Sequence, residues 1–257
     1  MTGGWGALQA RVMRRLPHRR DESGTSLVEL AAAMFLFGII VASVATLSIG
    51  FARTNAENMN RQDQVDVARS SVERMSRNVR TAVMPSQMSA TCTGCTEDAF
   101  VLGKNLEVQF YANVDNTGNT VGPSRVTYQV TNISGGFGTL VEKVQVPDSA
   151  TPTASGYQYC NAELSSASAA CKARLKTRIL ARGVDTSTPL FSYYNQSGTR
   201  LTPASAGLTA TDLSNVLGVE LHLTVQQQSA VKANGTTYIQ RITLPNAQAV
   251  MRQSEDS

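Results

Sequence analysis

Arg19-Arg-Asp-Glu-Ser-Gly-Thr-Ser-Leu-Val-Glu-Leu30 is the stretch that decides the fold, because a polar, arginine-rich leader changes there into an apolar run. No charged residue occurs between Leu30 and Ala52. As an α-helix these positions would extend roughly 34 Å, which exceeds the bilayer core of about 30 Å. A buried core helix is the alternative, but such helices are usually shorter and amphipathic. The run therefore predicts a membrane-spanning helix.

The distribution of charge orients this helix. The chain has 257 residues and a formal net charge of +4, and five arginines precede the apolar run: Arg11, Arg14, Arg15, Arg19 and Arg20. Because positive residues beside a span stay in the cytoplasm, we expect residues 1–24 inside and the C-terminal part outside. The rest of the chain is almost neutral and shows no basic face for phosphates. We therefore expect no direct nucleic-acid binding.

Gly24 lies at the junction between the leader and the apolar run. An ordinary secretory signal is cleaved after its apolar region, whereas this junction precedes it. Glu29 is ionisable and lies near the end of a span, where a charge is costly unless it snorkels or pairs. Cleavage after Gly24 would give Thr25 a free α-amino group four residues from Glu29, on one helix face. We therefore assign Gly24 and Thr25 to processing and Glu29 to assembly.

Gly24, Thr25 and Glu29, followed by the apolar helix, resemble the prepilin leader and methylation motif of type IV pilins and of type II secretion pseudopilins. The resemblance implies cleavage after Gly24 by a prepilin peptidase and N-methylation of Thr25. Thr25 departs from the family pattern, in which the first mature residue is most often Phe or Met. The full layout is most similar to W-type minor pilins and J-type minor pseudopilins.

The same resemblance implies a function, a place in the cell and a set of partners. The chain would be a minor pilin or pseudopilin, a structural subunit of a type IV pilus-like filament. It would cross the cytoplasmic membrane once, in contact with membrane lipid, and then enter a filament on the cell surface or in the periplasm. Its expected partners are prepilin peptidase, other pilins or pseudopilins and an inner-membrane assembly platform. A filament-tip adhesin or DNA-binding subunit is the alternative, and it would need a basic or aromatic patch on the head.

The helix is predicted to continue beyond the span. Apolar residues recur there at alternating spacings of three and four: Val65, Ala68, Val72, Met75, Val79 and Ala82. No proline occurs between Thr25 and Met84, and Pro85 would stop the helix. The expected parts are a cytoplasmic leader over 1–24, a transmembrane helix over 25–52, an amphipathic continuation over 53–84 and an exported head over 85–257.

The head changes to a period of two, which is typical of half-buried strands. The predicted strands cover residues 106–110, 126–130, 139–146, 175–184, 190–194, 219–225 and 236–244. The segment 147–170 is weakly patterned and predicts a long loop. Polar residues alternating with apolar ones indicate an antiparallel sheet with one face covered, and the apolar stripe is a natural cover. The predicted fold class is therefore α+β, a pilin-like long N-terminal helix packed on an antiparallel β-sheet head.

All four cysteines, Cys92, Cys95, Cys160 and Cys171, follow the apolar run. An even number on the exported side fits two disulfides in an oxidising compartment. A redox Cys-x-x-Cys motif would need a βαβ context, and a zinc site would need a second ligand pair at matching spacing. Local pairing, 92 with 95 and 160 with 171, is favoured, but spacing alone leaves the connectivity open.

Catalytic residues are scarce in this sequence. His18 lies in the leader, and His222, the other histidine, lies in a predicted strand. A Ser–His–Asp triad could be built only on His222, and no Gly-x-Ser-x-Gly turn accompanies it. No glycine-rich phosphate loop follows a strand and opens a helix. We therefore expect no enzyme activity, no cofactor and no metal site.

Overall fold

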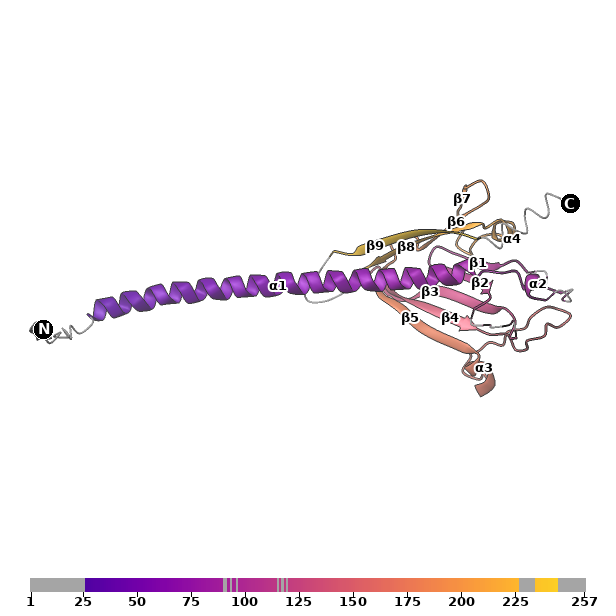
Figure 1. The fold of residues 1–257 in the computed structure, drawn as a ribbon, viewed down its shortest axis with the longest axis horizontal. Coiled ribbons are helices and arrows are strands. Elements are labelled where there is room, and N and C mark those ends of the chain that lie inside the picture. The colour runs from indigo at the N-terminus through magenta and orange to yellow at the C-terminus, as the bar shows by residue number, and fades with distance from the viewer. Residues whose placement is uncertain are drawn as a thin grey trace, which may run out of the picture. The chain divides into compact units, whose positions relative to one another are not determined.

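The computed structural model describes residues 26–89, 92, 94, 95, 97–114, 116, 118, 120–226 and 234–244. The chain divides into two compact units, Met1–Phe51 and Ala52–Ser257. Helix α1 (Leu27–Arg80) contributes its apolar first part to the first unit and its remainder to the second (Figure 1). The predicted leader over 1–24, which ends at Gly24, lies outside the described residues, and so does Thr25.

Helix α1 ends at Arg80 rather than at the predicted Met84. The chain leaves the helix early because Ala82 already forms an antiparallel bridge with Ala112 at the end of a strand. Pro85 therefore does not stop α1. It begins the short helix α2 (Pro85–Met88), where a proline at the first position costs no hydrogen bond.

Nine strands in the described part of the chain form one curled antiparallel sheet (Figure 1). They are β1 (Phe100–Gly103), β2 (Glu107–Ala112), β3 (Ser124–Ser134), β4 (Phe137–Gln145), β5 (Leu175–Asp185), β6 (Phe191–Tyr194), β7 (Arg200–Leu201), β8 (Gly218–Val225) and β9 (Thr236–Thr243). Their order is β1-β2-β3-β4-β5-β8-β6-β7, with β9 on the other edge of β8. Short helices α3 (Ala169–Ala173) and α4 (Ala210–Ser214) lie in the connections. The α+β fold class is confirmed.

The sheet turns a corner between β5 and β8. These strands share a single pair, Val184 with Val225, and then diverge (Figure 1). Beside this pair, Gly183 has φ 68°, and a Cβ atom there would lie 2.1 Å from the carbonyl oxygen of Gln226. Only glycine allows both this left-handed backbone and so close an approach of the two chains. The corner therefore depends on Gly183.

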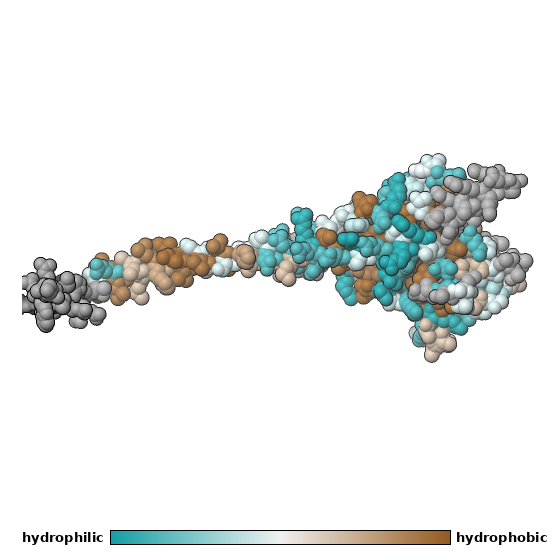
Figure 2. All heavy atoms as spheres, in the orientation of Figure 1, coloured by the Kyte–Doolittle hydropathy of each residue, from teal (hydrophilic) through white to brown (hydrophobic). Residues whose placement is uncertain are grey.

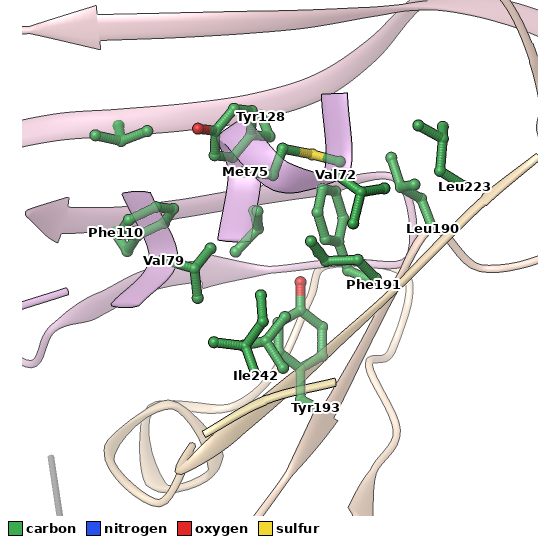
Figure 3. Packing of buried hydrophobic residues seen from close by; sticks show 14 of the residues in the cluster. Val72, Met75, Val79, Phe110, Tyr128, Leu190, Phe191, Tyr193, Leu223 and Ile242 are labelled. Carbon is green, nitrogen blue, oxygen red and sulfur yellow. The ribbon is translucent and has the colours of Figure 1, made fainter. Parts of the chain in front are cut away.

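The predicted apolar stripe of α1 packs into the hydrophobic core of the head (Figure 3). Its fully buried members meet large side chains from six strands: Phe110, Tyr128, Leu140, Phe191, Tyr193, Leu221, Leu223 and Ile242. Val65 was predicted in this stripe but is 39% exposed, and Gln64 is buried in its place. The oxygen of the Gln64 side-chain amide lies 3.4 Å from the Thr236 hydroxyl on β9. The first turn of α1 that contacts the sheet therefore does so through polar groups.

Two strands that do not pair with each other hold α1 from either side. The Ser71 hydroxyl donates a hydrogen bond of 3.0 Å to the carbonyl of Leu180 on β5. The Thr236 hydroxyl of β9 contacts Gln64 as described above. Helix α1 between Ala52 and Arg80 therefore links the two diverging parts of the sheet.

Candidate membrane and assembly site

The first unit presents an apolar surface along the helix from Leu27 to Phe51 (Figure 2). Its large side chains are exposed, for example Phe35 at 70%, Leu47 at 75% and Phe51 at 76%. Within the described residues α1 is the one helix long and apolar enough to cross a membrane. So much apolar surface is unfavourable in water, which means that the segment needs a bilayer or partner helices around it.

The hydroxyl side chains in this segment form hydrogen bonds to backbone carbonyls of the same helix. The hydroxyls of Ser43, Thr46 and Ser48 each donate to a backbone carbonyl three or four positions earlier, at 2.8, 2.9 and 2.8 Å. A lipid environment demands that polar groups find internal partners, because no water is present to replace them. These hydroxyls are therefore compatible with a membrane span.

Glu29 lies in the first turn of α1, and its carboxylate accepts a hydrogen bond of 3.1 Å from the backbone N–H of Ser26. This contact is half of a capping box, in which the side chain of the third helical residue accepts a hydrogen bond from the backbone N–H of the residue just before the helix. A negative charge there also suits the positive end of the helix dipole. The cap was not anticipated, although the Ser-x-x-Glu spacing of Ser26 and Glu29 indicates it. The predicted pairing of Glu29 with the Thr25 amine falls outside the described residues and stays a prediction.

A second charged group lies inside the head, where it joins α1 to the sheet. Glu142 of β4 is 2% exposed and accepts hydrogen bonds from three side chains. The Arg74 Nε atom lies 3.0 and 2.8 Å from its two oxygens, the Asn78 amide 2.9 Å and the Tyr128 hydroxyl 2.9 Å from Oε1. Burial, and then the neighbouring Glu142 charge, raises the pKa of Tyr128 well above its ordinary value. Since every partner is in place, this cluster holds the helix on the sheet in one register.

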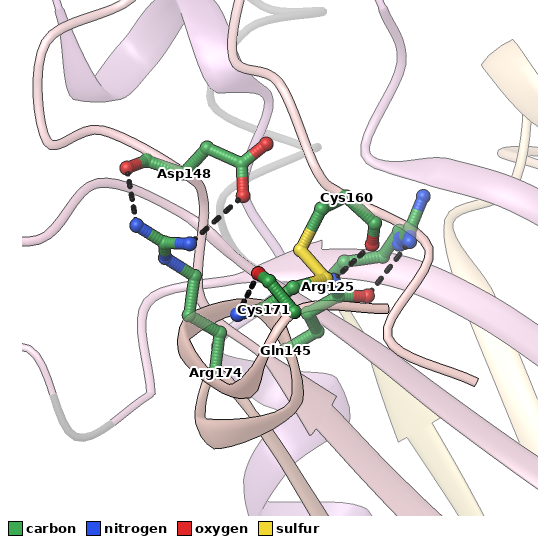
Figure 4. A network of polar contacts seen from close by, with 7 residues as sticks. Arg125, Gln145, Asp148, Cys160, Cys171 and Arg174 are labelled. Carbon is green, nitrogen blue, oxygen red and sulfur yellow. Dashed lines mark hydrogen bonds and ion pairs between the residues drawn. A yellow bond between two sulfur atoms is a disulfide. The ribbon is translucent and has the colours of Figure 1, made fainter. Parts of the chain in front are cut away.

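Both local disulfides are present, Cys92 with Cys95 and Cys160 with Cys171. The second one pins the loop between β4 and β5 (Figure 4). Gln145 at the end of β4 donates to the Cys160 carbonyl, and its own amide oxygen accepts from Arg125 at 2.8 Å. The cysteines therefore stiffen surface loops of the head.

Potential metal-ligating side chains are scattered in the described part of the chain. No group of three or more His, Cys, Asp or Glu side chains there could hold a metal ion. His222 of β8 lies between the buried Leu221 and Leu223 and is itself half-buried, in the alternation that the sequence predicts.

Models of protein families, curated proteins and solved structures contain no match to this chain. The class of protein must therefore be argued from the architecture. A long N-terminal apolar helix that packs its second half on an antiparallel sheet is consistent with a pilin-like fold.

Proposed function

We propose that this protein is a minor pilin or pseudopilin, a structural subunit of a type IV pilus-like filament. The observation that carries the proposal is the continuity of α1, whose exposed apolar part is followed in the same helix by the part that forms the head's core. Such a helix serves first as a membrane anchor and then as the element through which a folded head is held in a helical assembly.

Processing and partners complete the proposal. Prepilin peptidase cleaves after Gly24 and Thr25 becomes the methylated first residue. The head lies outside the cytoplasmic membrane, where its two disulfides are stable. The subunit then leaves the bilayer at an inner-membrane assembly platform and packs its apolar helix against those of other pilins or pseudopilins. The protein performs no catalysis in this role.

The sequence of the mature N-terminus tests the proposal. The chain is purified from membranes and from a sheared filament fraction, and its N-terminal residue is determined. We expect methylated Thr25 in both fractions. A mature chain that begins near residue 50, after the apolar run, would show an ordinary secreted protein and overturn the proposal. A Gly24→Leu variant is the matched control, because it should accumulate uncleaved in the membrane and be missing from filaments.

A further inference from the structure

Strand β5 is paired along one edge and open along most of the other. Its whole length pairs with β4, whereas its opposite edge meets β8 at Val184 alone, at the margin of the sheet (Figure 1). The carbonyl of Arg174 accepts a hydrogen bond from Val146, just after β4, so every second residue from there directs its backbone groups toward β4. The residues between them direct their backbone groups to the open edge: Leu175, Thr177 and Ile179.

The open edge of β5 is available to another strand. Among the described residues, no hydrogen bond reaches the backbone groups of Leu175, Thr177 or Ile179 on this side. The nearest bond along the edge is the one that the Ser71 hydroxyl donates to the Leu180 carbonyl. Thr177 and Ile179 are exposed, so the described chain leaves this edge in contact with solvent. Three alternate residues therefore offer donors and acceptors along about 17 Å of strand.

The same strand carries a local excess of positive charge. Five basic residues and no acidic one occur between positions 172 and 182: Lys172, Arg174, Lys176, Arg178 and Arg182. Arg174 has an acidic partner, Asp148, at 3.5 Å. The three basic residues within β5 are exposed, and none of them is in an ion pair that the described residues form. The nearly neutral charge of the head as a whole did not predict this cluster.

An apolar groove continues the open edge toward the corner with β8. It has a volume of about 300 Å³, and its apolar lining comes from α1, β5 and β8, including Val67, Ile179, Leu180 and Val225. Proteins that bind an extended peptide at a sheet edge use backbone hydrogen bonds for affinity and pockets beside the edge for side-chain specificity. Strand β5 offers both, because Ile179 belongs to the open edge and to the groove.

We propose that the open edge of β5 binds an extended acidic segment of another protein, which adds a strand to the sheet. The segment has acidic side chains at alternate positions, opposite Lys176 and Arg178, and aliphatic side chains between them. Charge complementarity selects this occupant, because the same edge of a second copy would present positive charge and be repelled. The site lies on the head and goes beyond the proposed filament function, on which it does not rest.

Charged side chains on an edge strand also serve in some proteins only to prevent pairing. Two observations favour binding at β5. The apolar groove beside the edge adds nothing to such protection. Strand β9 also pairs on one side only, yet its single charged residue, Arg241, is paired with Glu220 at 3.0 Å. If the edges of this sheet were charged for protection, β9 should carry free charges as well.

Binding of synthetic peptides to the full-length chain in a nonionic detergent tests the proposal. The probe is a fluorescently labelled Thr-Val-Glu-Val-Glu-Val-Thr peptide, and its binding is measured by anisotropy. We expect it to bind, and we expect a Thr-Val-Lys-Val-Lys-Val-Thr peptide to bind roughly tenfold more weakly. A third peptide repeats the acidic sequence with N-methylated valines, which cannot donate to the edge, and it should lose binding as well. Equal binding of the three peptides, or no binding of the first, would overturn the proposal.

Variants of the chain locate the bound peptide. Lys176→Glu/Arg178→Glu should weaken binding of the acidic peptide roughly tenfold and strengthen binding of the basic one. Thr177→Pro removes the central N–H of the open edge, which does not bond to β4, and should weaken binding roughly fivefold. Proline is tolerated at such a position of an edge strand, so the head should still fold. Thr237→Pro makes the equivalent change on the open edge of β9 and is the matched control, for which no loss is expected.

A nucleic acid or another polyanion would meet the same basic residues without adding a strand. A single-stranded oligonucleotide is therefore measured against the same variants. Peptide binding that falls with Thr177→Pro as well as with Lys176→Glu/Arg178→Glu supports the added strand. Peptide binding that Thr177→Pro leaves unchanged would show a surface for polyanions and overturn the proposal, whatever the oligonucleotide does. Neither result bears on the filament function, which the residue at the mature N-terminus tests separately.

Discussion

Arg74 of α1 holds Glu142 of β4 through two atoms, with Nε 2.8 Å and the terminal guanidinium nitrogen 2.8 Å from Oε2. The carboxylate side chain is 2% exposed, whereas that of the arginine is 37% exposed. The pair therefore bridges the surface of the helix and the interior of the head. Asn78 and Tyr128 complete the bonding of the carboxylate from the buried side.

Replacing Glu142 by Ala should destabilise the head strongly. Three donors would lose their acceptor, and breaking a buried charge pair costs about 3–5 kcal/mol. Because Arg74 can reach water, we expect the lower end, about 3 kcal/mol, in urea unfolding followed by tyrosine fluorescence. Arg69→Ala removes the exposed Arg69–Glu73 pair and is the matched control, for which no measurable change is expected. Equal stability of the Glu142→Ala and Arg69→Ala variants would contradict the role of the buried cluster.

The head should lose stability at high pH. Burial is the main cause that raises the pKa of Tyr128, Tyr159 and Tyr193 above the ordinary value. A raised folded pKa means that stabilisation is complete below the unfolded value of about 10 and is lost as the pH rises through the folded one. The free energy of unfolding should therefore fall above about pH 10, by up to about 1.4 kcal/mol per pH unit for each tyrosine.

A Tyr128→Phe variant checks this assignment. It should be less stable at pH 8, because Glu142 loses one donor, but its decline above about pH 10 should be shallower, by up to about one proton at pH 11 and above. An unchanged slope would show that Tyr128 does not contribute to the alkaline transition.

Gly183→Ala should disturb the corner between β5 and β8. The added methyl would meet the Gln226 carbonyl, and the backbone conformation disfavours any side chain. Gly135→Ala is the matched control, because Gly135 has φ 58° but nothing within 4 Å of its added Cβ. We expect about 1 kcal/mol of destabilisation for the control, from the backbone alone, and clearly more for Gly183→Ala. Thermal unfolding of both variants measures the difference.

Glu29 can be tested for two roles separately. Glu29→Gln keeps an acceptor for the Ser26 N–H but removes the charge, whereas Glu29→Ala removes both. If charge pairing drives assembly, both variants should reach the membrane and lose the leader, yet both should be absent from sheared filaments. A Glu29→Gln variant that assembles at the level of the unchanged chain would leave Glu29 with the capping role only.

The part of the fold that the sequence predicts well depends on local periodicity. The stripe from Ala68 to Ala82 was correct because each of these side chains faces the same core, and the alternating strands followed from the same argument. The predicted end of α1 at Met84 was wrong because Ala82 forms a β-bridge with Ala112, thirty positions away. No local sequence pattern indicates that bridge.

Long-range partners also explain what the sequence did not reveal about the candidate site. Glu142 stands between Leu140 and Val144 in an alternating strand, so its position on the buried face could have been read. The partners of Glu142 could not be predicted from the sequence, because Arg74 and Asn78 lie 68 and 64 positions earlier in the chain. Residues 147–170 form a connection without strands, as predicted. The sequence alone does not show that this loop is attached to Gln145.

Gln64 and Thr236 are in contact although they lie 172 positions apart in the chain. The head therefore cannot finish folding around α1 until strand β9 has been synthesised. Helix α1 is synthesised before strand β9, which forms one wall of its binding site and follows 172 positions later. During synthesis the buried face of the helix therefore stays uncovered until the strands that pack on it have been made. Contacts between such distant segments form slowly and leave apolar surface open to wrong partners. A newly made chain should thus be most vulnerable to proteolysis and aggregation until β9 arrives, and truncations before Thr236 should be degraded even though most of the sheet is present.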